Sequence, residues 1–359
     1  MEDNVEKSNT GYEMRHVRAG SSVAGAKRSL RRSCAVAFAG ALFSVLAAGR
    51  AAAMHASDDP ALEVTEKNPF GIAVSVRCTA GVVDGRAEEI IYGATSKGAA
   101  VTQSRLTWDI KDITLAGAIV SALVDNDFNV NLGLWKTMSR GSGRLDNYDW
   151  VEDYGYGADQ WAFRSLHDVF VESSYMFDLN GSMKLYGGGD NSTMCLVLGF
   201  KRDEWKWTDS VRELTRSDNS FRDFTTVVDG RRGIDYRQVY EIPYAGFSGR
   251  LNIGSVSFSG YVVGSFLVKA EDDDLHLWKN DHFTSSFSGG KYIAAGVAGQ
   301  WNITGQLFVS AAWEYQRVPE FSGDIALVEG GTGYIYTAEG AAGISHKSSM
   351  YSAALGWRF

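Results

Sequence analysis

The sequence predicts an all-β protein: a ten-stranded antiparallel transmembrane β-barrel that extends above the outer membrane. Three observations predict this fold: an N-terminal export signal, long runs of alternating apolar and polar residues, and connections that alternate between short turns and long polar loops. The composition agrees, because the 359 residues include 40 Gly, only 4 Pro and many aromatic side chains. Long, uninterrupted strands use residues in this way.

Residues 1–53 are predicted to be an N-terminal extension and a secretory signal peptide. Three arginines within 28–32 precede an apolar run at 34–49, and three alanines at 51–53 suit a cleavage site. The apolar run is shorter than the roughly 20 residues that a membrane helix needs. After this segment no apolar stretch of about 18 residues occurs, which excludes a helical membrane protein.

The mature chain is predicted to consist of a periplasmic lead at 54–69 and the barrel at 70–359. The full chain has a formal net charge of −8, and the segment removed carries more basic than acidic residues. Such an acidic chain is not expected to bind nucleic acid and favours cationic peptides as partners. Cys78 and Cys195 remain, and we interpret both as incidental apolar residues of strands rather than as a bridge or metal ligands.

Alternation with a period of two identifies the strands. It is clear in 128–136, in 255–268, where Phe266 and Val268 are predicted to share a face, and at the C terminus, which ends on Phe359. A soluble sandwich would alternate in the same way around an inner core, but the signal and the terminal Phe favour an outer-membrane barrel. The predicted strands are 70–92, 100–124, 128–143, 169–187, 193–209, 234–251, 255–270, 289–301, 306–319 and 346–359.

The connections between these strands predict the topology. Tight turns lie near 125–127, 188–192, 252–254 and 302–305, whereas long polar loops are predicted at 144–168, 210–233, 271–288 and 320–345. Short turns on one side and long loops on the other are typical of outer-membrane barrels, and an even strand number places both termini in the periplasm. Several strands exceed the roughly 9–11 residues of one crossing, so their upper ends should surround an aqueous groove.

Candidate chemistry lies in two acidic loops. In the first, at 271–276, Asp274 and His276 are two residues apart, so in an extended stretch the carboxylate can orient the imidazole as a general base. A solvated acidic loop with an uninvolved histidine explains the same residues. A calcium site of the EF-hand type is not supported, because its Gly and distal Glu are absent.

The second acidic loop, at 144–150, could bring a carboxylate across the barrel mouth to face His276, with a water between them. Turn formation by Asp and Asn explains the same residues and is the default interpretation of this loop. Motifs of serine hydrolases, zinc sites and nucleotide-binding loops are absent from the sequence, and no cofactor is expected. The histidines without a partner motif are predicted to be structural: His167, His282 and His346.

Over 70–359 the chain resembles the omptins, ten-stranded outer-membrane aspartyl-type endopeptidases of Gram-negative bacteria. The resemblance is carried by short motifs in a specific order: Asp149-Trp150, Phe177-Asp178-Leu179-Asn180, Phe221-Arg222-Asp223, Pro243-Tyr244, Asp274 with His276, and the terminal Phe359. It favours the catalytic interpretation of Asp274 and His276 over the solvated loop.

The resemblance implies roles for the catalytic residues. Asp274 and His276 would form a dyad in which His276 activates a water that attacks the peptide carbonyl, with Asp149 on the opposite wall. The family has a second Asp two residues before Asp149, where this chain has Asn147. Asn supplies no negative charge. The neighbouring Asp146 would replace it only if the loop shifted by one residue.

The resemblance also implies a specificity and a lipid partner. Glu89 and Asp272 correspond to the acids that receive the arginine before the scissile bond, whereas the acid for the following basic residue is replaced near Phe163. We therefore expect an apolar or small residue after the cut. Omptins depend on lipopolysaccharide held by basic residues, so the resemblance implies outer-membrane lipid as a partner. Glu204 and Val239 stand where two arginines are expected, so lipopolysaccharide dependence is a possibility that these two positions do not support.

Two function classes follow from the sequence. The first is a surface endopeptidase that cleaves polypeptides after arginine. The second, motivated by Asn147, is a catalytically impaired barrel that acts as an adhesin or passive surface protein. A diffusion pore is disfavoured, because side chains largely fill the lumen of a ten-stranded barrel.

Overall fold

The computed structural model describes residues 55–65, 70–187 and 191–359. The predicted signal peptide and part of the predicted lead lie outside the described residues. Within them the structure contains the following twelve strands: β1 (Ile72–Ala94), β2 (Ala100–Val124), β3 (Phe128–Thr137), β4 (Gly143–Asp149), β5 (Phe163–Gly187), β6 (Ser192–Arg216), β7 (Phe224–Val227), β8 (Ile234–Ile253), β9 (Val256–His276), β10 (Asp281–Asn302), β11 (Leu307–Val328) and β12 (Ile335–Arg358).

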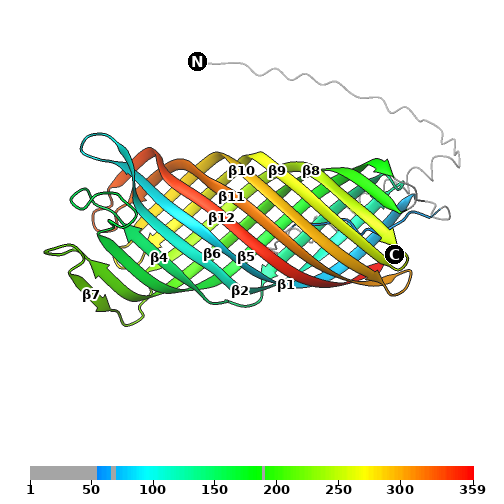
Figure 1. Ribbon diagram of the computed structural model, residues 1–359, viewed down its shortest axis with the longest axis horizontal. Helices are drawn as coiled ribbons and strands as arrows, with labels where there is room; N and C mark the ends of the chain where they lie inside the picture. The colour runs from blue at the N-terminus through cyan, green and yellow to red at the C-terminus, as the bar shows by residue number, and fades with distance from the viewer. Residues whose placement is uncertain (1–54, 66–69, 188–190) are drawn as a thin grey trace, which may run out of the picture. The chain divides into compact units, whose positions relative to one another are not determined.

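The strands form one antiparallel sheet that closes into a barrel, because β5 pairs with β6 as well as with β3 and β4. Both β3 and β4 lie between β2 and β5, so these two segments share one position in the wall. β7 extends only the tip of β6. The closed wall therefore has ten positions, which confirms the predicted all-β antiparallel barrel, although its strands are divided into twelve segments (Figure 1).

The predicted long loops are largely wrong, because most of their residues belong to strands. Residues 271–276 continue β9 and pair with β10, and the turn between these strands covers only 277–280. Residues 143–149 form β4, and 320–328 continue β11. The polar composition of these stretches reflects strands with solvated faces above the membrane rather than irregular loops.

Apolar side chains face outward on the halves of the strands nearest the short turns. They include Leu198, Phe258, Val262, Phe266, Val297 and Tyr351, all of them exposed, as expected of a wall in contact with lipid. In β9 the alternation then slips, since Phe266 and Leu267 are both exposed and Val268 is fully buried. The prediction that Phe266 and Val268 share a face is therefore wrong, because an irregularity in the β9–β10 pairing separates them. No helix among the described residues is long and apolar enough to span a membrane.

Above this apolar belt, an aromatic cluster fills part of the barrel interior. Trp108, Trp205, Trp207 and Tyr236 are fully buried, and the rings of Trp108 and Tyr236 stack with their centroids 4.8 Å apart. The rings come from β2, β6 and β8. Close packing of rings from separate strands gives the upper barrel a rigid core on which polar side chains can be held.

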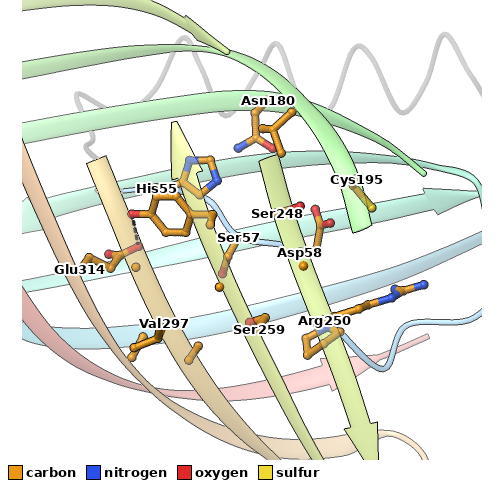
Figure 2. A pocket seen from close by; sticks show the side chains of 18 residues that line it. His55, Ser57, Asp58, Asn180, Cys195, Ser248, Arg250, Ser259, Val297 and Glu314 are labelled. Atoms are coloured by element: carbon orange, nitrogen blue, oxygen red, sulfur yellow. Dashed lines mark hydrogen bonds between the residues drawn. The ribbon is translucent and has the colours of Figure 1, made fainter. Parts of the chain in front are cut away.

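At the opposite end, residues 55–60 lie inside the barrel and fill its lumen. The Asp59 carboxylate accepts two hydrogen bonds from the Arg358 guanidinium, at 2.7 and 2.9 Å, and Asn180 Nδ2 donates to the Ala56 carbonyl at 2.8 Å. Figure 2 shows His55, Ser57 and Asp58 of this segment among side chains of the surrounding strands. We refer to residues 55–60 as the plug. The plug occupies the lumen at this end of the barrel.

Candidate active site

Alternation along the upper end of β9 turns three of its polar side chains inward. Asp272 and Asp274 are buried and His276 is partly buried, whereas Asp273, between them, faces outward and lies 3.1 Å from His282. The site residues expected in a loop are thus held by a strand that pairs with both β8 and β10. A paired strand fixes side-chain direction more firmly than a loop does.

Asp274 and His276 are in contact, as their spacing predicts, and we refer to them as the dyad. His276 Nε2 lies 2.8 Å from Asp274 Oδ2. Because the carboxylate accepts, Nε2 carries the proton and Nδ1 keeps a lone pair that can act as a base. The dyad lies above the apolar belt, outside the membrane-spanning part of the strands. Burial lowers the pKa of His276, so the imidazole is neutral at neutral pH.

Asn147 and Asp149 lie on β4, facing the same interior. Asn147 accepts a hydrogen bond from Ser104 Oγ at 3.3 Å and donates through Nδ2 to Ser165 Oγ at 3.4 Å. Burial raises the pKa of Asp149, an effect larger than the opposing hydrogen bonds from Ser104 and Asn147. β4 pairs regularly with β2 and β5, so the strand shows no one-residue shift.

The suggested replacement of the missing carboxylate by Asp146 is wrong. Asp146 points to the outside, where both of its oxygens accept hydrogen bonds from Arg164, at 2.8 and 3.1 Å. Successive residues of a strand face opposite sides, so Asp146 cannot reach the interior while Asn147 occupies it. Asn147 is therefore the residue that the fold presents at this position.

A cavity of about 380 Å³ is lined by residues of both β9 and β4. It is lined by His276 from β9 and by Asn147 and Asp149 from β4, with Phe163 at the start of β5. The fold thus brings together the dyad and the opposite pair that the sequence placed in separate loops. The cavity has room for several waters.

Glu89 and Asp272 form a second group of acids beside the dyad. Tyr236, a member of the aromatic cluster, donates its hydroxyl proton to Asp272 Oδ2 at 3.3 Å, and the Glu89 carboxyl from β1 is close to those of Asp272 and Asp274. Burial raises the pKa of Asp272 to about 6. Burial, and then the charges of Asp274 and Asp272, raise the pKa of Glu89. A cation entering here would relieve this crowding of negative charge.

Sequence reasoning missed a second His–Asp pair. His167, expected to be structural and without a partner, is buried on β5 with its Nδ1 in contact with Asp209 Oδ2 of β6. Asp209 Oδ1 also accepts hydrogen bonds from the backbone N–H groups of Gly233 and Ile234, both at 2.7 Å. His167 lines the same cavity as His276. The pair spans 42 residues, and only the β5–β6 register could have indicated it.

The described ranges hold no group of three or more His, Cys, Asp or Glu side chains arranged to bind a metal ion. Asp274 is hydrogen-bonded to His276, and Asp272 accepts a hydrogen bond from Tyr236. The arrangement therefore provides a neutral base, a carboxylate that orients it and, beside them, the two buried acids Glu89 and Asp272. The absence of a cofactor stays a prediction.

Comparison with known proteins extends this picture. Residues 71–359 match the Omptin family. The plasminogen activator of Yersinia pestis is 25% identical over 287 residues, which cover 79% of this chain and 89% of that protein. The outer membrane protease OmpP of Escherichia coli K12 is 23% identical, over 80% of this chain and 90% of that protein.

Among solved structures, the outer membrane protease OmpT from Escherichia coli superimposes with a TM-score of 0.75. The aligned part covers 80% of this chain and 97% of OmpT, at 21% sequence identity. This likeness supports the barrel fold. The residues of the site have to be judged on their own geometry.

Proposed function

The chain belongs to the omptin family of outer-membrane proteases, and from this premise we propose that it is an endopeptidase that cleaves polypeptides after arginine. The observation that carries the proposal is the cavity lined by His276 on one wall and by Asn147 and Asp149 on the other. A base and a carboxylate on facing walls can hold one water between them.

In the proposed reaction, the His276 imidazole removes a proton from that water as the water oxygen bonds to the peptide carbonyl carbon. Asp274 stabilises the imidazolium through its contact with Nε2. The carbon–nitrogen bond then breaks, and the amine nitrogen takes a proton from the imidazolium. Asp149 helps to hold the water. Because Asn147 brings no charge, it contributes only hydrogen bonds.

The acids beside the dyad support a preference for arginine before the scissile bond. A guanidinium has five donors in a planar fork, and a buried guanidinium needs carboxylate partners. Glu89 and Asp272 are buried and lack a guanidinium partner among the ion pairs of the described residues. Phe163 at the cavity wall favours an apolar or small residue after the cut.

A specific observation supports the second candidate function. Asn147 occupies an inward position where a charge would help to activate water, and it is hydrogen-bonded to Ser104 and Ser165. A barrel without hydrolytic activity that serves as an adhesin or passive surface protein would tolerate this residue. The two candidates differ in whether the purified protein cleaves peptides at all.

The test is cleavage of a fluorogenic peptide library by the purified protein in lipid, with and without lipopolysaccharide. We expect cuts after arginine with apolar or small residues following, and a loss of at least about 100-fold in kcat/KM for His276→Ala. His282→Ala is the matched control, because His282 is on the outer face beside Asp273. Strict dibasic cleavage would contradict the role of Phe163. Equal activity of His276→Ala and wild type would end the proposal.

A further inference from the structure

Two buried carboxyl groups, those of Glu89 and Asp274, lie close together beside His276 and Asp272. Glu89 on β1 and Asp274 on β9 come from strands that are not neighbours in the wall, and their carboxyl groups lie close together in the barrel interior. Their exposed fractions are 4% and 1%. The contact therefore lies out of reach of bulk solvent.

Two ionised carboxylates cannot hydrogen-bond to each other, because each can only accept. If both were ionised, Glu89 Oε2 and Asp274 Oδ1 would each be buried without a donor among the described residues. Orphaned acceptors of this kind are costly inside a protein. A single proton held between the two oxygens satisfies both atoms and removes one negative charge.

The surroundings favour such a proton. Charges of the same sign come from β9 and from β6, and His276 is the group whose positive form would favour ionisation of Glu89. Since burial keeps His276 neutral, this compensation is weak in the free protein. The titratable groups around the pair are Asp272, Asp273 and His276 on β9, Asp209 on β6 and Tyr236 on β8.

We propose that Glu89 and Asp274 share one proton in the free protein, and that the guanidinium of an arginine substrate displaces it. The inference rests on the proposed function, since it assigns the substrate arginine to the acids Glu89 and Asp272. The guanidinium brings a positive charge and donors that replace the proton at Glu89. The proton passes to solvent, and Asp274 is left fully ionised.

Loss of the shared proton affects His276 directly. Asp274 Oδ2 accepts a hydrogen bond from His276 Nε2. A full negative charge on Asp274 therefore makes His276 a stronger base when substrate is present. A peptide without a cation would leave the shared proton in place and the base weaker. Selection for arginine would then act on kcat as well as on KM.

Isothermal titration with agmatine, a guanidinium compound without a peptide bond, tests the exchange. Titrations of the folded barrel at pH 7 are run in buffers of different ionisation enthalpy. We expect about one proton to be released per agmatine bound, and an affinity that rises with pH while the pair still holds its proton. Glu89→Gln should bind agmatine without releasing a proton, because its amide donates permanently to Asp274.

Two further variants separate this effect from simple loss of charge. Asp272→Asn should bind agmatine more weakly and still release the proton, since it leaves the Glu89–Asp274 contact intact. Glu88→Gln is the matched control, because Glu88 accepts a hydrogen bond from Ser345 at 2.9 Å away from the pair. It should behave like wild type. Asp272→Asn also keeps the test decisive if Glu89→Gln does not fold.

The outcomes separate the two proposals. If wild type binds agmatine with a heat that does not depend on the buffer, the shared proton is ruled out, while peptide cleavage that depends on His276 still supports the peptidase. If wild type binds no agmatine, recognition of arginine by Glu89 and Asp272 is ruled out, and so is displacement of a shared proton by the guanidinium. If the library is not cleaved either, the proposed function falls as well.

Discussion

In the proposed mechanism, a single side chain, Asn147, limits how strongly the site activates water. It faces the interior of a regularly paired strand and is held by Ser104 and Ser165. A carboxylate at this position would place a charge beside the water that Asp149 and His276 are proposed to hold. We therefore expect Asn147→Asp to raise kcat at least about tenfold, measured on the peptide library in lipid at pH 7.

The matched control for this change is Asp146→Asn, which alters the neighbouring outward residue and its contact with Arg164. It should leave kcat unchanged. If Asn147→Asp has the same kcat as an active wild type, Asn147 is not a limitation. If wild type is inactive and Asn147→Asp alone cleaves, the passive surface protein becomes the better account of the natural chain.

For single residues, the sequence predicts contacts between near neighbours in the chain well and contacts between distant residues poorly. The spacing of Asp274 and His276 places them on one face of any extended segment, so their contact needs no knowledge of the fold. Glu89 and Asp149 could be connected to the dyad only through a resemblance to a family. The contact of His167 with Asp209 depends on strand register, which the sequence around either residue does not encode.

Among the elements, the upper ends of the strands differ most from prediction. The run of acids at 271–274 has the composition of a loop, but its residues alternate between the interior and the outer face of β9. The usual pattern of apolar and polar faces cannot identify such a strand, because both of its faces are polar. The lower halves of the strands do show this pattern, because their outward positions are apolar and face lipid, and so the sequence predicts these halves correctly.

The segment between β6 and β8 depends on one buried carboxylate. Asp209 binds His167 and the backbone N–H groups of Gly233 and Ile234, where this segment enters β8. Removing it leaves three buried groups without their partner. We expect Asp209→Ala to lower the free energy of unfolding by about 3 kcal/mol or more, measured by urea unfolding in lipid vesicles.

A neighbouring carboxylate provides the comparison. Asp168 lies next to His167 but faces outward and pairs with Arg212 at 2.7 Å, with both side chains well exposed. Asp168→Ala should change the free energy of unfolding by less than about 1 kcal/mol. Equal losses for the two variants would show that Asp209 does not anchor this segment.

For the whole molecule, the plug closes the end of the barrel opposite the site. Its main anchor is the buried pair of Asp59 and Arg358, which joins the start of the described chain to its last strand. Sequence alone could not reveal this contact, since the lead was expected to lie in the periplasm. The plug therefore occupies the lumen at the end of the barrel opposite the dyad.

The plug also shields a cysteine that can report its release. Cys195 is buried and lines the same space as Asp58 (Figure 2). In a Cys78→Ser background, we expect Asp59→Ala to raise the rate of maleimide labelling of Cys195 at least about tenfold, because it leaves Arg358 buried without its partner. Asp127→Ala is the matched control, as Asp127 is exposed and lies 3.9 Å from Lys184. Equal labelling rates in all three proteins would mean that the Asp59–Arg358 pair does not hold the plug in place, and that the lumen is closed by the rest of the segment.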